Sequence, residues 1–343
     1  MDTISRKADH LRINVERDVT GKGIDNGFGA YAFVHNALPE IDFDEVDAGT
    51  TLFGRKLSAP ILISCMTGGT KEAAAINQRL ARVAAKHGFA MGLGSGRALL
   101  EHPETHPHFD VRRLAPETLL FVNFGAVQLN RGYGVDDCRR LVETLNADVL
   151  VLHLNPLQEA IQPEGDRNFR GLLGKIERLC AAIAVPVVVK EVGWGLAADV
   201  VSKLAQAGVA GVDVAGAGGT SWSEVERHRI SEPWRVQVAA AFAGWGIPSA
   251  EALRQARDAA PDLPVIASGG IHDGLEIAKA LGMGADAVGI AGPFLRAADA
   301  GMERADAFAR TLVEVLRVAM FGVGAATIAE LRGTPRLQHI QGR

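Results

Sequence analysis

The feature that most constrains the fold is an eightfold alternation of short β-rich runs with helical stretches. The β-rich runs, such as PVVVKEV at 186–192, are continuously apolar, as is typical of parallel strands covered on both faces. The stretches between them, such as 73–86, 195–207 and 274–281, are alanine-rich with amphipathic helical spacing. The predicted strands are 60–64, 90–94, 119–124, 148–154, 186–192, 211–215, 263–268 and 287–291. This order predicts a closed (β/α)8 barrel of the TIM type.

An open, doubly wound sheet is the alternative architecture, but it needs a phosphate-binding fingerprint after its first strand. The segment CMTGGT at 65–70 lacks the GxGxxG spacing, and GxxxxGK[ST] occurs nowhere in the chain. Two parts lie outside the repeat: an N-terminal arm and extension at 1–59, and a long insertion after the sixth strand at 216–248. We expect one domain, 1–343, with 60–343 forming the barrel and the extra segments serving as lids or binding loops.

Charge and cysteine usage exclude several classes of protein. The 36 Lys and Arg residues against 40 Asp and Glu residues give a net charge of −4, which argues against a nucleic-acid surface. Cys65, Cys138 and Cys180 fit no disulfide framework or metal site and are expected to be reduced thiols of a cytoplasmic protein. The N-terminus is too charged for a signal peptide, and the apolar stretch at 318–329 is too short to span a membrane.

Strands seven and eight are each followed by glycines, where barrels of this class commonly bind phosphate. Strand seven ends in Ser268, Gly269 and Gly270, and strand eight ends in Ala291 and Gly292. Such glycines let backbone N–H groups approach an anion, and a helix N-terminus favours negative charge. Ordinary turn glycines are the alternative, but the occurrence of the pattern in both loops favours a phosphate site.

Lys190 lies near the end of strand five, after three valines. A lysine inside a parallel strand is costly to bury unless it faces an anion. A structural carboxylate partner is one explanation. A reduced flavin is a better one, because its negative charge near N1 would be stabilised by an ammonium group.

Strand four ends in a cluster of polar residues: His153, Asn155, Gln158 and Glu159. His153 and Asn155 are in phase, so both are expected to point into the barrel mouth. They could be hydrogen-bonded core groups, but four polar residues at one strand end favour a site. Glu159 is a candidate ligand for Mg²⁺, which takes one or two carboxylates together with phosphate oxygens.

The remaining strand ends carry neutral and basic groups. Thr67, Ser95 and Asn123 offer hydrogen bonds suited to a flat heterocycle, and Arg97 adds a cation. Cys65 has no identifiable activating partner and is interpreted as a core thiol. In the arm, Arg6 and Lys7 would normally be solvated. If the arm folds over the barrel mouth, they would join Arg97 in binding a diphosphate.

Taken together, these motifs resemble the type 2, FMN-dependent isopentenyl diphosphate isomerases. The resemblance runs along nearly the whole chain: RK at 6–7, ALPE at 37–40, MTGGT at 66–70, GSxR at 94–97, HLNxLQE at 153–159, PEGDR at 163–167, VKEVG at 189–193, GAGGTSW at 216–222, SGGI at 268–271 and AGPF at 291–294. HLNxLQE followed closely by PEGDR is the most specific part, whereas SGGI is shared by many flavin barrels.

The resemblance implies an isomerase of isoprenoid biosynthesis that interconverts isopentenyl diphosphate and dimethylallyl diphosphate. It implies reduced FMN, Mg²⁺ and NADPH as reductant, and a homotetramer or homo-octamer. The residues implied to contact FMN are Met66, Thr67, Gly68, Ser95, Asn123, Lys190, Thr220, Ser268, Gly269, Gly270, Ala291 and Gly292. Those implied to contact the substrate are Arg6, Lys7, Ser95, Arg97, His153, Asn155 and Gln158, with Glu159 on the metal.

Moving a double bond adds one proton and removes another, without net redox change. An amide is no acid or base near neutral pH, so we expect Gln158 to orient the substrate while reduced FMN handles the protons through N5 or N1. Lys190 would stabilise the flavin's charge, and Glu226 in the insertion is a further candidate for the proton path. His153 completes the set of predicted catalytic residues.

Two positions depart from the pattern of the family that the chain resembles. Gly96 stands where glutamine is usual, which removes one polar contact on the diphosphate side. Ala215 stands where serine is usual, so one hydrogen bond to the flavin is expected to be missing. Neither position belongs to the proton chemistry, and both changes are expected to affect affinity.

Three rival functions remain. An α-hydroxy-acid oxidase would need a histidine base and an arginine pair; the insertion offers His228, Arg227 and Arg229, but not at a strand end. An inosine-phosphate dehydrogenase would need a cysteine in the loop after strand six, and this loop has none. A non-catalytic flavin- or phosphate-binding sensor would not need HLNxLQE.

Overall fold

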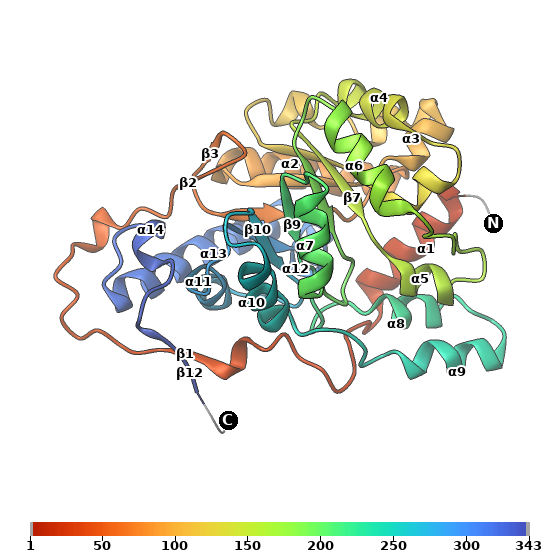
Figure 1. Ribbon diagram of the computed structural model, residues 1–343. Helices are drawn as coiled ribbons and strands as arrows, with labels where there is room; N and C mark the ends of the chain where they lie inside the picture. The colour runs from red at the N-terminus through yellow and green to blue at the C-terminus, as the bar shows by residue number, and fades with distance from the viewer. Residues whose placement is uncertain (1–2, 341–343) are drawn as a thin grey trace.

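The computed structural model describes residues 3–340 and contains a closed barrel of eight parallel strands (Figure 1). The strands are β4 (Ile61–Ile63), β5 (Ala90–Ser95), β6 (Leu120–Gly125), β7 (Val149–His153), β8 (Val187–Lys190), β9 (Gly211–Asp213), β10 (Val265–Ser268) and β11 (Ala287–Ile290). Their order around the barrel follows the chain, and β11 pairs with β4 to close it. The predicted (β/α)8 barrel is therefore confirmed, and each predicted strand overlaps an observed one.

The barrel interior is filled by apolar side chains, so it is a packed core rather than a channel. Leu62, Phe121 and Ile266 are buried there in one cluster. The same cluster includes Leu52 and Leu57 from a β-hairpin in the N-terminal extension. This hairpin consists of β2 (Thr50–Leu52) and β3 (Arg55–Leu57). Because these side chains belong to the interior cluster, the hairpin contributes to the core that fills the barrel.

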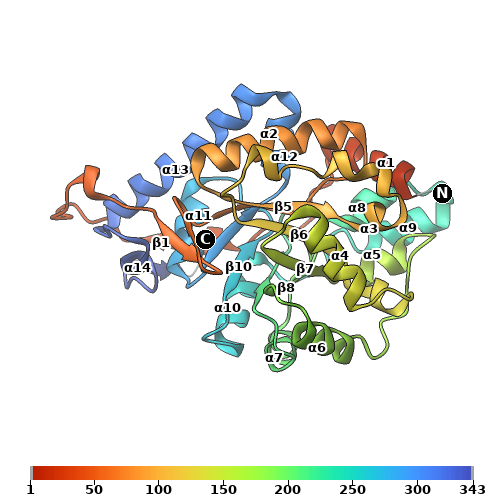
Figure 2. The same cartoon turned by 90° about the horizontal axis from the view of Figure 1, so that it is seen from above.

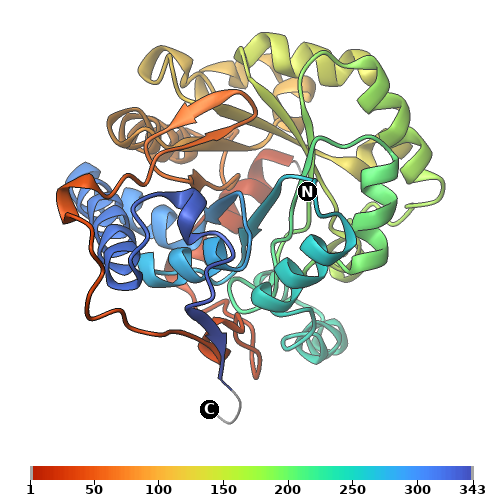
Figure 3. The same cartoon turned by 60° about the vertical axis from the view of Figure 1, so that its left-hand side comes forward.

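Helices surround the strands (Figures 2 and 3). They are α2 (Lys71–His87), α3 (Arg97–Glu101), α4 (Val135–Leu145), α5 (Pro156–Ile161), α6 (Leu172–Ala182), α7 (Ala198–Gln206), α10 (Ser249–Ala259), α11 (Gly274–Gly282), α12 (Gly292–Ala300), α13 (Met302–Val323) and α14 (Ile328–Leu331). The segment after β5 has only the five-residue α3 and 3₁₀ turns, because Pro103 and Pro107 interrupt regular helix. The helix α2 ends at Gly88, which adopts the left-handed conformation with φ 64°.

The N-terminal extension contains a helix that was not expected from its polar sequence. This helix, α1 (Thr3–Glu16), lies against α8 (Trp222–Arg227) and α12 near the carboxyl ends of the strands. Its apolar face buries Ile13 against Val19 and Val225. Further along, β1 (Tyr31–Phe33) pairs antiparallel with β12 (Leu337–His339), which joins the N-terminal extension to the C-terminal segment in a small sheet outside the barrel.

The predicted insertion after the sixth strand forms two helices, α8 (Trp222–Arg227) and α9 (Pro233–Ala241). Two isolated β-bridges hold the insertion in place. One pairs Thr220 with Thr20 of the extension, and the other pairs Ala217 with Pro248, close to the two ends of the insertion. The insertion and the extension therefore meet each other at the barrel mouth. Among residues 3–340, no helix has the length and apolar character required to cross a membrane.

Candidate active site

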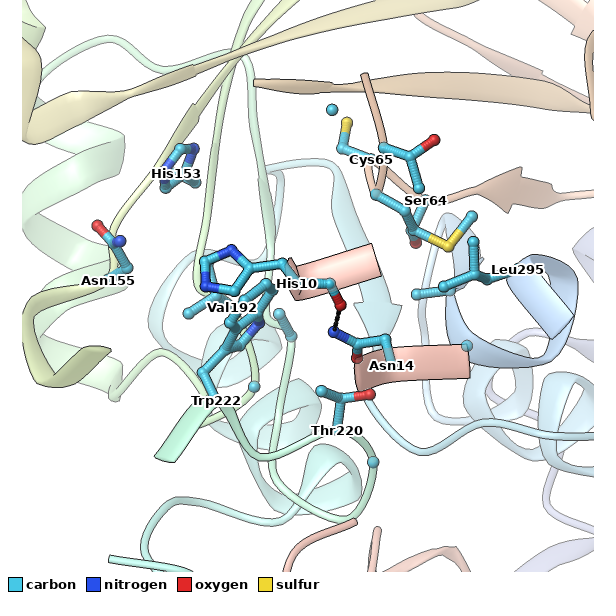
Figure 4. A pocket seen from close by; sticks show the side chains of 18 of the residues that line it. His10, Asn14, Ser64, Cys65, His153, Asn155, Val192, Thr220, Trp222 and Leu295 are labelled. Atoms are coloured by element: carbon cyan, nitrogen blue, oxygen red, sulfur yellow. Dashed lines mark hydrogen bonds between the residues drawn. The ribbon is translucent and has the colours of Figure 1, made fainter. Parts of the chain in front are cut away.

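A cavity of about 300 Å³ opens at the carboxyl ends of the barrel strands (Figure 4). It brings together residues from the extension, the strand ends and the insertion. All predicted site residues except Glu226 line it: Arg6, Lys7, Met66, Thr67, Gly68, Ser95, Arg97, Asn123, His153, Asn155, Gln158, Glu159, Lys190, Thr220, Ser268, Gly269, Gly270, Ala291 and Gly292. Figure 4 shows His10 and Asn14 on α1 projecting into the same space as His153 and Asn155 of the β7 end.

Lys190 forms part of the cavity wall at the end of β8 and is only 8 % exposed. Its Nζ donates to the backbone oxygen of Glu191 at 2.5 Å. The neighbouring strand places Asp213 opposite Lys190 in register, and Asp213 is buried. Both explanations of this lysine therefore find support, because it lines the cavity and also has a buried carboxylate on the adjacent strand.

Glu191 faces away from the cavity chemistry and shapes the loop after β8. Its Oε2 accepts the backbone N–H groups of Val192, Gly193 and Trp194 at 2.6–2.7 Å. Burial raises the pKa of Glu191 to about 7, although these three hydrogen bonds and the charge of Lys190 oppose that rise. The carboxylate thus fixes the turn that carries Val192 and Gly193 into the cavity wall.

His153 is held as a neutral imidazole. Burial, and then the positive charge of Lys190, Lys7 and Arg6, lower its pKa to about 3. Its Nδ1 lies 2.7 Å from Oδ1 of Asn123. With that oxygen as acceptor, Nδ1 carries the proton and Nε2 is left as an acceptor. In this protonation state Nε2 of His153 has no N–H and cannot donate a hydrogen bond to a phosphate oxygen. The expected contact with the diphosphate therefore requires Nε2 to take up a proton.

Asn155 and Gln158 form the next part of the β7 end. The amide nitrogen of Asn155 donates to Gln158 Oε1 at 3.1 Å and to Glu159 Oε1 at 3.0 Å. Gln158 in turn donates to Glu226 Oε1 at 3.0 Å. Asn155 Oδ1 is buried without a protein partner and is available to a ligand. The amide of Gln158 is therefore oriented from both sides.

Glu226 is not among the residues that line the cavity and lies behind Gln158, so its place in the proton path stays a prediction. The residue is fully buried, on α8. His10 contacts Oε1 at 3.0 Å and Arg229 donates to Oε2 at 2.5 Å. Burial would raise the pKa of Glu226, but the hydrogen bond with His10, the charges of His10 and Arg229 and the bond from Gln158 outweigh it and lower the pKa. Glu226 is therefore ionised and accepts the hydrogen bond that orients Gln158.

Glu159 is buried, and both of its oxygens accept hydrogen bonds. Oε2 accepts the backbone N–H of Asp166 at 2.6 Å, while Oε1 accepts Asn155. Burial raises its pKa, with the negative charge of Asp166 acting in the same direction. Within the described residues, no group of three or more His, Cys, Asp or Glu side chains could hold a metal by themselves. A cation here would need further ligands from a substrate.

The basic side of the cavity combines α1 with the β5 end. Lys7 donates to the backbone oxygen of Ser95 at 2.6 Å and lies 5.2 Å from the centre of the Phe109 ring. Burial, followed by the charge of Arg6, lowers the pKa of Lys7 to about 7. Arg97 donates to Glu101 at 2.7 Å and to Asp166 at 3.2 Å. The arm does fold over the barrel mouth.

The glycines after β10 are required by the insertion that packs on them. Gly269 has φ 103° and Gly270 has φ 67°, and a Cβ on either would overlap the backbone of 216–219. The Ser268 hydroxyl donates to Asp213 at 2.5 Å. The loop after β11 starts α12 at Gly292, so the N-terminus of this nine-residue helix faces the cavity. Arg296 also lines this region.

The loop after β4 contributes Cys65, Met66, Thr67 and Gly68 to the cavity lining. Thr67 donates its hydroxyl to Asn77 Oδ1 at 2.9 Å, so only its oxygen lone pairs remain for a ligand. Burial raises the pKa of Cys65 to about 11, which makes its thiol a poor nucleophile. A Cβ on Gly68 would overlap the Phe109 ring. The interpretation of Cys65 as a core thiol is correct only in part, because the residue is half-buried and lines the cavity.

Several cavity residues were not identified from the sequence. His10, Asn14 and Trp222 line the cavity, and the rings of His10 and Trp222 contact edge to face at 5.1 Å. Gln162 also lines it; turning its amide lets it donate to Glu226 and accept from Arg6. His10 and Asn14 are four residues apart, so they lie on the same face of α1. This spacing could have identified them only if a helix had been predicted there.

The histidine and arginine residues of the oxidase alternative do not reach the cavity. Arg227 pairs with Glu224 at 2.7 Å, and Arg229 pairs with Glu226 and Glu164. His228 is exposed at the end of α8. None of the three is among the cavity-lining residues.

Comparison with known proteins shows the family of this chain. The sequence profile of the FMN-dependent dehydrogenase family matches residues 4–101 and 155–338. The isopentenyl-diphosphate delta-isomerase of Nostoc sp. is 48% identical over 99% of this chain and 97% of its own length. The enzymes of that name from a Synechococcus strain and from Stutzerimonas stutzeri are 52% and 51% identical, over 95% and 98% of this chain and 94% and 97% of theirs.

Among solved structures, a mandelate oxidase variant with an FMN adduct superimposes with a TM-score of 0.64 at 19% identity, covering 98% of this chain and 99% of that one. A chimera of (S)-mandelate dehydrogenase gives 0.67 at 17% identity, with coverage of 98% and 99%. At this identity the likeness concerns the fold alone. The chain belongs to the FMN-dependent dehydrogenase family and, within it, to the isopentenyl-diphosphate delta-isomerases.

Proposed function

We propose that this chain interconverts isopentenyl diphosphate and dimethylallyl diphosphate as an FMN-dependent isomerase. The observation that carries the proposal is a single cavity with a basic side from α1 and β5, a lysine wall at Lys190, and an oriented amide at Gln158. The reaction adds a proton at one carbon and removes one at another, so it needs an anion site beside a place for proton transfer. The names of the relatives, isopentenyl-diphosphate delta-isomerases, support the same substrate pair.

The cavity residues fit FMN. Buried polar atoms without a protein partner, Ser64 Oγ and Asn155 Oδ1, face the region where a ligand would supply the missing hydrogen bonds. The N-terminus of α12 and the backbone at 269–270 would hold the phosphate, and Lys190 with Thr67, Ser95 and Asn123 would surround the ring. When bound in its reduced state, FMN would supply ring nitrogens able to exchange protons with the substrate.

The diphosphate would bind against Arg6, Lys7 and Arg97. Three cations around one polyanion form charge-assisted hydrogen bonds that are stronger than neutral ones. Glu159 would contribute one carboxylate to Mg²⁺, with the remaining ligands coming from the diphosphate and water. His153 would accept a proton at Nε2 as the diphosphate arrives, because added negative charge raises a nearby imidazole pKa.

Gln158 would fix the position of the hydrocarbon end of the substrate. Its amide is held between Asn155 and Glu226, so it presents one geometry to the cavity. Glu226 acts through Gln158 and His10 and is a positioning residue in this scheme. Trp222 lies on the same side and, together with α1, would restrict the access of water.

We further propose that NADPH reduces the FMN and that the protein acts in isoprenoid biosynthesis. We also propose a cytoplasmic location and assembly as a homotetramer or homo-octamer. We also treat 1–343 as one FMN-binding domain, since residues of the extension, the barrel and the insertion line the same cavity.

The decisive experiment mixes the purified protein with FMN, NADPH, Mg²⁺ and isopentenyl diphosphate without oxygen and follows dimethylallyl diphosphate. Product formation that depends on reduced flavin is the expected result. A protein that binds and reduces FMN but forms no product would contradict the isomerase proposal. A protein that binds FMN and keeps it in the reduced state, but turns over no substrate, would favour a non-catalytic sensor.

A further inference from the structure

Asp213 is a buried carboxylate beneath the cavity that the proposed chemistry does not use. It lies at the end of β9, is 2 % exposed and is not among the lining residues. Its partner in register on β8 is Lys190, which does line the cavity. The two residues therefore occupy neighbouring positions on adjacent strands, and only the lysine reaches the space that would hold the flavin.

The contacts of Asp213 favour a carboxylate over a neutral acid. Its Oδ1 accepts the hydroxyl of Ser268 at 2.5 Å and the backbone N–H of Ala215 at 3.2 Å. Burial raises the pKa of Asp213, while Lys190 and these two donors oppose the rise. A charge-assisted acceptor bonded by two donors is best satisfied when ionised.

The position of this charge matters for a flavin because reduction changes the charge of the ring. Uptake of two electrons and one proton leaves reduced FMN with one negative charge, whereas the oxidised ring is neutral. Lys190 would stabilise that charge. A carboxylate next to Lys190 offsets part of its field and so disfavours the reduced ring relative to the oxidised one.

We propose that Asp213 is a positioning residue that limits the positive field of Lys190 and thereby sets the reduction potential of bound FMN. This inference rests on the proposed FMN site and names a further residue for it. Asp213 never touches the substrate in this scheme; it acts through Lys190.

The test is Asp213→Asn, studied with the FMN-loaded full-length protein. The amide keeps an acceptor for Ser268 and Ala215, so the change removes charge with little change of shape. We expect the ratio of affinities for reduced and oxidised FMN to rise about tenfold, which for a two-electron couple is about 30 mV more positive. Potentials would be read by equilibration with a reference dye.

Three further variants make the outcome decisive. Asp199→Asn removes an exposed charge on α7 and should leave the potential unchanged. Lys190→Met should shift the potential in the opposite direction, and adding Asp213→Asn to it should have a smaller effect than in the parent chain. Asp213→Ser should also raise the potential, which covers the case in which the asparagine variant does not fold.

A potential that stays constant or falls in the Asp213 variants would overturn the inference. Equal weakening of both FMN redox states, at constant potential, would show a purely structural role. No substrate is present in these measurements, so their result stands apart from the isomerase assay. A chain that shows the shift but no turnover would contradict the proposed function and leave this inference intact.

Discussion

Gln158 on α5 and Glu226 on α8 are joined by a hydrogen bond of 3.0 Å between Nε2 and Oε1, and Glu226 has no exposed surface. The link connects the end of a barrel strand to the insertion that follows a different strand. His10 of α1 meets the same carboxylate oxygen, so three distant segments converge on one atom. This convergence explains how a non-ionisable side chain such as Gln158 can be held in a fixed geometry.

Replacing Gln158 by Asn shortens the side chain by one methylene group and removes its reach to Glu226. A misplacement of about 1 Å can cost about 100-fold in rate, so we expect a fall of about 10- to 100-fold in kcat. FMN should remain bound, which its visible absorbance would show. Gln338→Asn, the same change at an exposed position of β12, should leave kcat unaltered. Loss of flavin from the Gln158 variant would contradict its orienting role.

Lys7 should make substrate binding depend on pH. Its pKa is lowered to about 7 by burial and by Arg6, so the free protein loses this positive charge as the pH rises above that value. A diphosphate prefers the protonated form, so KM is expected to increase from about pH 6.5 to about pH 8.5. Lys7→Met should have a higher KM whose pH profile reflects only the titration of the substrate. Identical slopes in both proteins would show that Lys7 does not titrate in this range.

Gly269 should tolerate no side chain. It has φ 103°, and a Cβ there would overlap the carbonyl oxygen of Gly216. Gly269→Ala is expected to lower the free energy of unfolding by about 3 kcal/mol and to release FMN. Gly322→Ala is the matched control, because Gly322 lies within α13 with no atom within 4 Å of its Cβ position. That change should stabilise the protein by up to about 1 kcal/mol in urea unfolding.

Gly96 departs from the glutamine that the resemblance leads one to expect, and the structure shows what occupies the space. A Cβ at this position would lie 2.7 Å from Cδ2 of Leu141. Gly96→Gln alone should therefore destabilise the protein by about 1–3 kcal/mol through overpacking, without lowering KM. Combined with Leu141→Val, the new glutamine should lower the KM for the diphosphate substrate. A lower KM in the Gly96→Gln variant alone would show that the Leu141 side chain moves aside without a large cost in stability.

The other departure, Ala215, also has a structural consequence. Its φ of 37° is in the left-handed region that non-glycine residues seldom adopt. Its N–H donates to Asp213, which ties this conformation to the buried carboxylate beneath the cavity. The loss of a side-chain hydroxyl at 215 thus leaves the backbone contact in place.

Much of the barrel could be predicted because its periodicity is local. Continuous apolar runs such as 186–192, separated by amphipathic stretches, specify parallel strands and covering helices without knowledge of distant contacts. Residues at strand ends, such as Lys190 and His153, could be selected because parallel strands present their carboxyl ends at one face. The helix α1 was missed because its composition is mostly polar and its apolar face is buried only by tertiary contacts, such as that of Ile13 with Val225 of α8.

The sequence by itself determined the closed barrel and the face that carries the cavity, because the order of the strands and the positions of their ends follow from short-range patterns. All predicted site residues except Glu226 line that cavity. Only the tertiary structure decided that α1 closes over the cavity, that Glu226 lies behind Gln158, and that Asp213 is placed beside Lys190. Those relationships join segments far apart in the chain, and they arise from packing and desolvation, which no local pattern encodes.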